Sequence, residues 1–119
     1  MYLNTVLYRF TASGLTPESA FHAHAKADGA GEHDAFASRA DLEKVRTVSV
    51  VHERDPLRDA GAFDGADGGP LSEANAEWLA DRLIEEDDQR ASSGAAALLL
   101  DFETPAPSWL FFGWGIRAE

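Results

Sequence analysis

The residues best suited to chemistry in this sequence are histidines and carboxylates near positions 22–34. Imidazole nitrogens and carboxylate oxygens are suitable ligands for divalent zinc, manganese or nickel. The candidate ligands are His22, His24, Asp28 and His33. The spacing of His22 and His24 suits a strand, but on the helix predicted here they diverge by about 200°. Only His24 and Asp28 would then share a face, so we predict no metal site and no cofactor.

Other patterns in the chain also fall short of a catalytic signature. His52 and Glu53 are neighbours on a predicted strand, so their side chains face opposite ways. The acidic segment 64–68 lacks the repeated ligand positions and the closing glutamate of a calcium loop. Residues 67–70 have neither the lysine nor the spacing of a phosphate loop, and no Gly-x-Ser-x-Gly motif occurs. We therefore predict no catalytic residue.

Charge and cysteine content restrict the function further. The chain has no cysteine, which excludes disulfides, thiolate catalysis and cysteine-ligated metal centres. Its 21 acidic residues against 10 Lys and Arg give a net charge of −11, and such a surface repels nucleic-acid phosphates. The abundance of aspartate and alanine and the scarcity of lysine resemble the composition of proteins from salt-accumulating halophilic archaea. This resemblance implies a salty solvent and says nothing about activity.

The 119 residues suit a single domain spanning positions 1–119. No apolar run is long enough to span a bilayer, and the first residues lack the basic start and apolar core of a secretory signal. We therefore expect a soluble, cytoplasmic protein without a membrane partner.

The elements needed to position these residues follow from local patterns. Pro17 after Thr16 suits the start of a helix, and Ser72 suits the cap of a second helix whose apolar residues recur at helical spacing. The predicted strands cover 2–11, 45–54, 96–103 and 108–116, and the predicted helices cover 19–27, 73–87 and, with less support, 32–40. We expect the acidic, glycine-rich segment 55–70 to be a mobile loop. This order predicts an α+β fold with two layers, in which about four strands form a mixed or antiparallel sheet and two to three helices cover one face.

The last strand carries the most distinctive feature, because it is apolar on both sides. Leu110, Phe112 and Trp114 share one side, and Trp109 and Phe111 share the other. If helices cover only one face of the sheet, an aromatic patch remains exposed, and exposed apolar patches mark interfaces. We therefore predict a homodimer with Trp109, Phe111 and Trp114 in its interface.

The resulting hypothesis is a non-enzymatic, homo-oligomeric binding or regulatory module. The alternative is a small metal-dependent enzyme or metal-binding protein that uses His22, His24 and His33. A third possibility is small-molecule binding between Trp78 and the sheet. The identity of any ligand or partner lies beyond the sequence.

Overall fold

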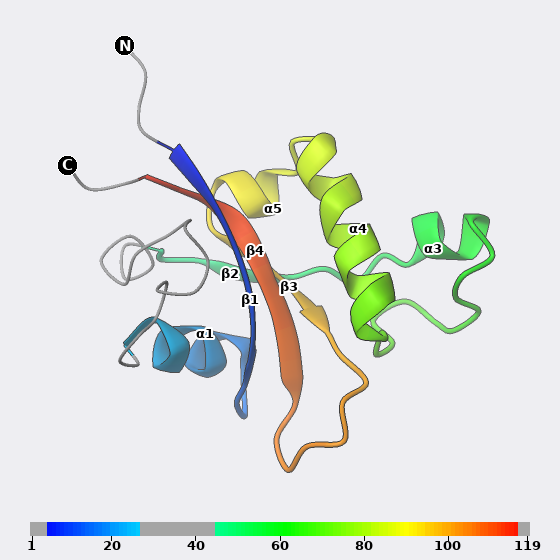
Figure 1. Cartoon of the computed structure of the whole chain (residues 1–119), viewed down its shortest axis with the longest axis horizontal. Helices are drawn as coiled ribbons and strands as arrows, with labels where there is room; N and C mark the ends of the chain where they lie inside the picture. The colour runs from blue at the N-terminus through cyan, green and yellow to red at the C-terminus, as the bar shows by residue number, and fades with distance from the viewer. Residues whose placement is uncertain (1–4, 27–44, 117–119) are drawn as a thin grey trace.

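The computed structural model describes residues 5–26 and 45–116. Their elements, in chain order, are β1 (Thr5–Ser13), α1 (Pro17–Lys26), β2 (Val48–Val50), α3 (Asp55–Asp59), α4 (Glu73–Glu85), α5 (Gln89–Ser92), β3 (Ala95–Leu99) and β4 (Ser108–Ile116). The strands form one mixed sheet in the order β1-β4-β3-β2 (Figure 1). The predicted α+β class with a four-stranded sheet is confirmed. The predicted helix at 32–40 lies outside the described residues.

The C-terminal hairpin forms as the sequence predicts. β3 and β4 pair antiparallel, with Leu98 opposite Leu110. β4 is the central long strand and also pairs antiparallel with β1 over the whole of Thr5–Ser13. The β1 strand thereby joins the two ends of the described chain, a pairing that no local pattern in the sequence specifies.

The strand predicted at 45–54 is shorter than expected and lies at an edge of the sheet. Only Val48–Val50 pairs, in parallel with β3. The chain then leaves the sheet because the Arg54 side chain turns inward and α3 begins at Asp55. The segment predicted as a loop at 55–70 therefore starts with a short helix.

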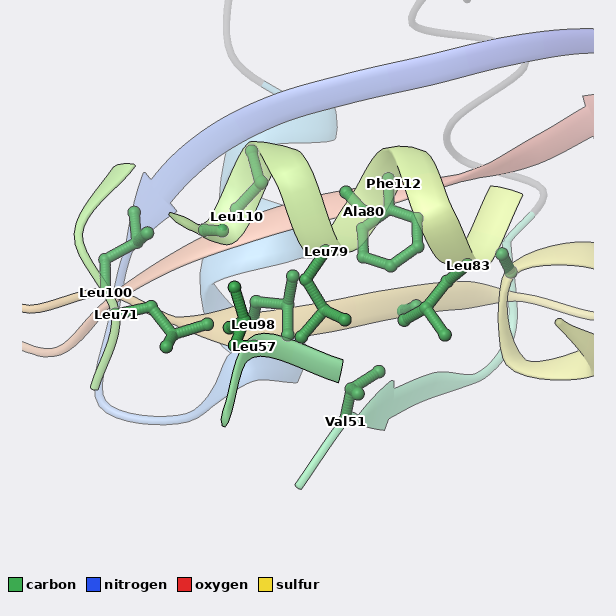
Figure 2. Close-up of a cluster of buried hydrophobic side chains, with 13 residues drawn as sticks. Val51, Leu57, Leu71, Leu79, Ala80, Leu83, Leu98, Leu100, Leu110 and Phe112 are labelled. Atoms are coloured by element: carbon green, nitrogen blue, oxygen red, sulfur yellow. The ribbon is translucent and has the colours of Figure 1, made fainter. Parts of the chain in front are cut away.

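The first core lies between the sheet and the helices α3, α4 and α5. Ser72 accepts a hydrogen bond from the Asn75 backbone N–H and caps α4, as its residue type predicts. Figure 2 shows Leu79 and Leu83 of α4 directed toward Leu98 and Phe112 of the sheet. The apolar stripe of α4 is therefore the face that packs on the sheet.

The second core lies on the opposite face, where α1 covers the sheet (Figure 1). Phe21 of α1 meets Phe111 edge-on, with the ring centroids 5.4 Å apart. Tyr8 of β1 is also buried here, and its hydroxyl donates to the Gly94 carbonyl oxygen over 3.0 Å. Helices thus cover both faces, because a strand that is apolar on both sides requires cover on both sides.

Among the described residues, no helix combines the length and the apolar composition that crossing a membrane requires.

Candidate functional site

Two of the histidines that the structure describes, His22 and His24, lie on α1 and contact different aromatic rings. His24 stacks on Phe10 of β1, with the ring centroids 3.8 Å apart and an angle of 11° between the rings. His22 instead meets Phe21 edge-on at 5.7 Å. Asp28 and His33 lie outside the described residues. Within the described ranges, no group of three or more His, Asp or Glu side chains could hold a metal ion.

The aromatic residues predicted to form an interface occupy three different environments. Phe111 is 0% exposed and lies under α1, so it is not available to a partner. Trp109 is half-buried on the same face, and its Nε1 has no hydrogen-bond acceptor among the described residues. Trp114 is half-buried on the α4 side of the sheet. The sequence predicted helices on one face of the sheet only, whereas α1 covers the face on which Phe111 lies.

Trp78 lies on the outer surface of α4 and not between this helix and the sheet. Its side chain is 41% exposed, and the Arg82 guanidinium carbon sits 5.8 Å from its ring centroid. The two residues border a shallow groove of about 550 Å³. The other residues lining this groove are Asp81, Glu85 and Glu86.

Two arginines hold the segments around β2 in place. Arg54 is 0% exposed and donates to the carbonyl oxygens of Val51 (2.8 Å) and Gly69 (3.0 and 3.1 Å). Arg90 binds Glu53 through two hydrogen bonds of 2.7 and 2.8 Å, and it also binds Asp88. These bonds from Arg90 hold the pKa of both carboxyls below their usual range. The Arg54 guanidinium thus binds backbone carbonyl oxygens, and the Arg90 guanidinium pairs with two carboxylates, so both arginines tie together segments that are apart in the sequence.

One feature of the described chain that is open to a partner is the outer edge of β1, the longer of the two terminal strands of the sheet. β1 is a terminal strand of the sheet and pairs only with β4. The direction of its backbone groups follows from one bond just beyond the strand. Gly14 donates its N–H to the Pro107 carbonyl oxygen over 3.0 Å, in the same register. Antiparallel pairs alternate between bonded and non-bonded positions, so even-numbered residues of β1 bond to β4.

Bonds on the other side of β4 agree with this assignment. Leu100 donates to the Ser108 carbonyl oxygen over 2.9 Å, which turns the even-numbered residues of β4 toward β3 and the odd-numbered residues toward β1. The N–H and C=O groups of the odd-numbered β1 residues therefore face away from the sheet. These outward residues are Thr5, Leu7, Arg9, Thr11 and Ser13. In the described part of the chain, no backbone bond reaches them.

The charge of β1 sets it apart from the rest of the chain. Its nine residues, TVLYRFTAS, contain no carboxylate, although the chain has 21. The one charge is Arg9, whose guanidinium bonds to Asp81 of α4 over 2.5 Å. Natural edge strands are usually protected from pairing by charges, prolines or bulges, and β1 has no proline. Its register with β4 is also continuous.

Apolar side chains lie close to this open edge on the α4 side. Leu7 of β1 stands opposite Trp114 of β4 in the register, and both are half-buried. Sequence patterns identified Trp114 but missed the open edge itself. The sequence feature that marks this edge is the absence of acidic residues from 5–13. It indicates an open edge only once the strand order is known.

Comparison with models of known protein families, with curated proteins and with solved structures finds no match for this chain.

Proposed function

We propose that the protein is a non-enzymatic binding module that associates with a second copy of itself through the outer edge of β1. The observation that carries this proposal is the row of outward backbone groups on Leu7, Arg9, Thr11 and Ser13, which have no backbone partner in the described structure. A strand added to such an edge gains main-chain hydrogen bonds along its length. Self-association is therefore the activity that the sheet supports best.

A second copy fits this edge better than an arbitrary partner. A protein with a net charge of −11 repels its own copies, and this repulsion is lowest where carboxylates are absent. β1 is a nine-residue strand without any. A strand that pairs antiparallel with its own copy also generates a closed two-fold dimer, and closure prevents further growth.

The side chains beside the edge support association as well. Leu7 and Trp114 keep part of their surface in solvent, and a strand placed beside β1 would cover more of it. Burying apolar surface contributes about 25 cal/mol per Å². Trp114 thus remains a candidate interface residue, on the face opposite to Phe111.

We propose that this self-association takes place in the cytoplasm and involves no nucleic acid. The chain has no cysteine to suit an oxidising compartment, and its charge of −11 opposes phosphate binding. Metal binding through His22, His24 and His33 is not part of the proposal, because His24 stacks on Phe10 and His22 meets Phe21 edge-on.

Two neighbouring proline substitutions test the proposal. Thr11→Pro removes an outward N–H, whereas Ala12→Pro removes an N–H that bonds to β4, so only the second breaks the existing ladder. Sedimentation equilibrium would be measured in about 1 M KCl, where the Debye length is about 3 Å.

We expect the wild type to be a dimer, Thr11→Pro to be a folded monomer and Ala12→Pro to be unfolded. If Thr11→Pro does not fold, Thr11→Lys places a charge at the same edge position and serves in its place. A wild-type protein that stays monomeric up to millimolar concentration contradicts the proposal. So does a folded edge variant that remains dimeric.

A further inference from the structure

We infer that α4 makes self-association depend on salt, because the side of this helix that faces the open edge of β1 carries unpaired carboxylates. In the dimer these carboxylates would face those of the partner subunit. This regulation rests on the proposed function: association is weak at low ionic strength and strengthens as salt screens the repulsion between the two helices.

One ion pair identifies the side of α4 that faces β1. Arg9 of β1 bonds over 2.5 Å to Asp81, which lies within α4. Residues four positions apart lie on nearly the same side of an α-helix, so Glu77 and Glu85 share this side with Asp81. We call these three residues the acidic flank of α4.

The acidic flank is exposed, and part of its charge is uncompensated. Asp81 and Glu85 line the shallow groove beside Trp78, and Glu77 is exposed as well. Arg9 neutralises Asp81. In the described part of the chain, neither Glu77 nor Glu85 forms an ion pair. Each subunit therefore presents two unpaired carboxylates on this flank.

Pairing of two β1 edges would place both copies of α4 on the same face of the joined sheet. Directly opposite residues of an antiparallel pair have their side chains on one face, so the two-fold axis of the dimer is perpendicular to the sheet. Arg9 points to the α4 side, where it meets Asp81. The two acidic flanks would consequently face each other across the paired β1 strands.

This arrangement holds in each register that pairs most of β1. Because only odd-numbered residues have outward backbone groups, these registers place Arg9 opposite Leu7, Arg9 or Thr11 of the partner subunit. The axis then lies beside Tyr8, Arg9 or Phe10, so Arg9 is never more than one residue from it. Since Arg9 holds Asp81, the middle of α4 lies near the axis in all three registers.

The distance between the flanks suits control by salt. α4 packs on β3 and β4, and the two β4 strands of the dimer would be three strand spacings apart, about 14 Å. A helix with its side chains is about 10–12 Å across, so the facing carboxylates approach to roughly 10 Å. The Debye length is about 10 Å in 0.1 M salt and about 3 Å in 1 M salt. The repulsion is therefore felt at the lower concentration and screened at the higher one.

Sedimentation equilibrium of the wild type and two double variants tests this regulation. Glu77→Gln/Glu85→Gln removes two charges from the acidic flank. The matched control, Asp59→Asn/Asp64→Asn, removes two exposed charges in and after α3, which follows the strand at the opposite edge of the sheet. Each protein is measured in about 0.1 M and about 1 M KCl. Sucrose is added at the lower concentration, because it favours the folded state without screening charge, and circular dichroism confirms folding.

We expect the wild-type dimer to be weaker at the lower salt concentration. There the Glu77→Gln/Glu85→Gln variant should dimerise roughly threefold to tenfold more tightly than the wild type, and the two should be about equal at the higher concentration. The control variant should match the wild type within about twofold at both concentrations, because its charges lie more than a Debye length from the partner.

Three results overturn the inference while the proposed dimer stands. Equal gains in both variants would show that net charge alone controls association. No gain in either variant would show that the acidic flanks do not face each other, and a wild-type dimer no weaker at the lower salt concentration would show that salt does not control it. A folded wild type that stays monomeric at the higher concentration overturns the proposed function itself.

Discussion

The backbone N–H of Gly14 bonds to the carbonyl oxygen of Pro107 over 3.0 Å, and this bond fixes the direction of every backbone group in β1. It makes the even-numbered residues of β1 partners of β4 and leaves the odd-numbered residues facing outward. The sheet therefore has a long open edge without a carboxylate on it. The functional proposal depends on this relationship, and the following predictions test it together with the packing around it.

Phe111 should contribute to folding and not to association. Phe111→Ala removes a ring that is 0% exposed under α1 and should lower the free energy of unfolding by about 3–5 kcal/mol. The matched control is Phe102→Ala, which removes a ring that is 40% exposed and should cost less than about 1 kcal/mol. Urea unfolding followed by tryptophan fluorescence measures both. A stable Phe111→Ala variant that has lost its dimer would place this residue in the interface instead.

Arg54 should hold the segment 61–69 against the end of β2. Arg54→Met leaves the carbonyl oxygens of Val51 and Gly69 without their donor, and each unsatisfied buried group costs about 1–3 kcal/mol. We expect a loss of about 2–4 kcal/mol and faster proteolysis within 61–69. Arg82→Met is the control, because that arginine pairs with Glu86 in solvent and should change stability by less than about 1 kcal/mol. Equal protease resistance of the Arg54→Met variant and the wild type would contradict this role.

Tyr8 should make stability depend on pH in the alkaline range. Burial raises the pKa of the Tyr8 phenol in the folded chain, whereas in the unfolded chain it ionises near pH 10. Above about pH 10 the unfolded state binds fewer protons, so stability should fall by up to about 1.4 kcal/mol per pH unit. Tyr8→Phe should cost about 1 kcal/mol at pH 7 through the lost bond to the Gly94 carbonyl.

Denaturant titrations from pH 7 to 11 compare the wild type with Tyr8→Phe. The stability gap between the two proteins should narrow above pH 10, because only the wild type has this phenol to ionise. Any other titrating group is common to both proteins. Parallel curves throughout this range would show that Tyr8 does not control the alkaline loss.

The pairs that Arg90 forms with Glu53 and Asp88 should contribute to acid sensitivity. Arg90 hydrogen bonds lower the pKa of both carboxyls in the folded chain, so the unfolded state binds more protons in the acidic range. Their contribution is therefore present above about pH 4 and is lost as the pH falls through the lowered folded values. Arg90→Gln should cost about 1 kcal/mol at pH 7, because the carboxylates are partly exposed to solvent. The cost should shrink toward pH 2, and a cost independent of pH would refute the assignment.

Local patterns predict much of the fold. Ser72 and the apolar spacing of 73–87 gave α4, and the two-sided apolar pattern of 108–116 gave a strand that needs cover on both faces. The sequence does not show which helix covers the second face of the sheet. Phe21, the residue of α1 that meets Phe111, belongs to a helix with few large apolar residues, so its contribution is visible only in the tertiary structure.

The candidate site was harder to predict, because it arises from long-range pairing. No local signal places β1 beside β4 and leaves its other edge open. The burial of Arg54 is equally invisible, since arginine usually lies at the surface. The carbonyl oxygens of Val51 and Gly69 that bind it come from segments on both sides of α3. The composition of 55–70 predicts a loop. Pro56, which suits the first turn of a helix, favours α3 instead, and the structure has this helix.

Amide hydrogen exchange along β1, measured at low and high protein concentration, tests the central claim most directly. The amides of Phe10 and Ala12 bond to β4 and should exchange slowly at both concentrations. We predict that the amides of Arg9 and Thr11 also exchange slowly at high concentration and become fast on dilution, because a second copy protects them. If Arg9 and Thr11 exchange rapidly at every concentration while Phe10 and Ala12 remain protected, the edge is open to water and the account is wrong.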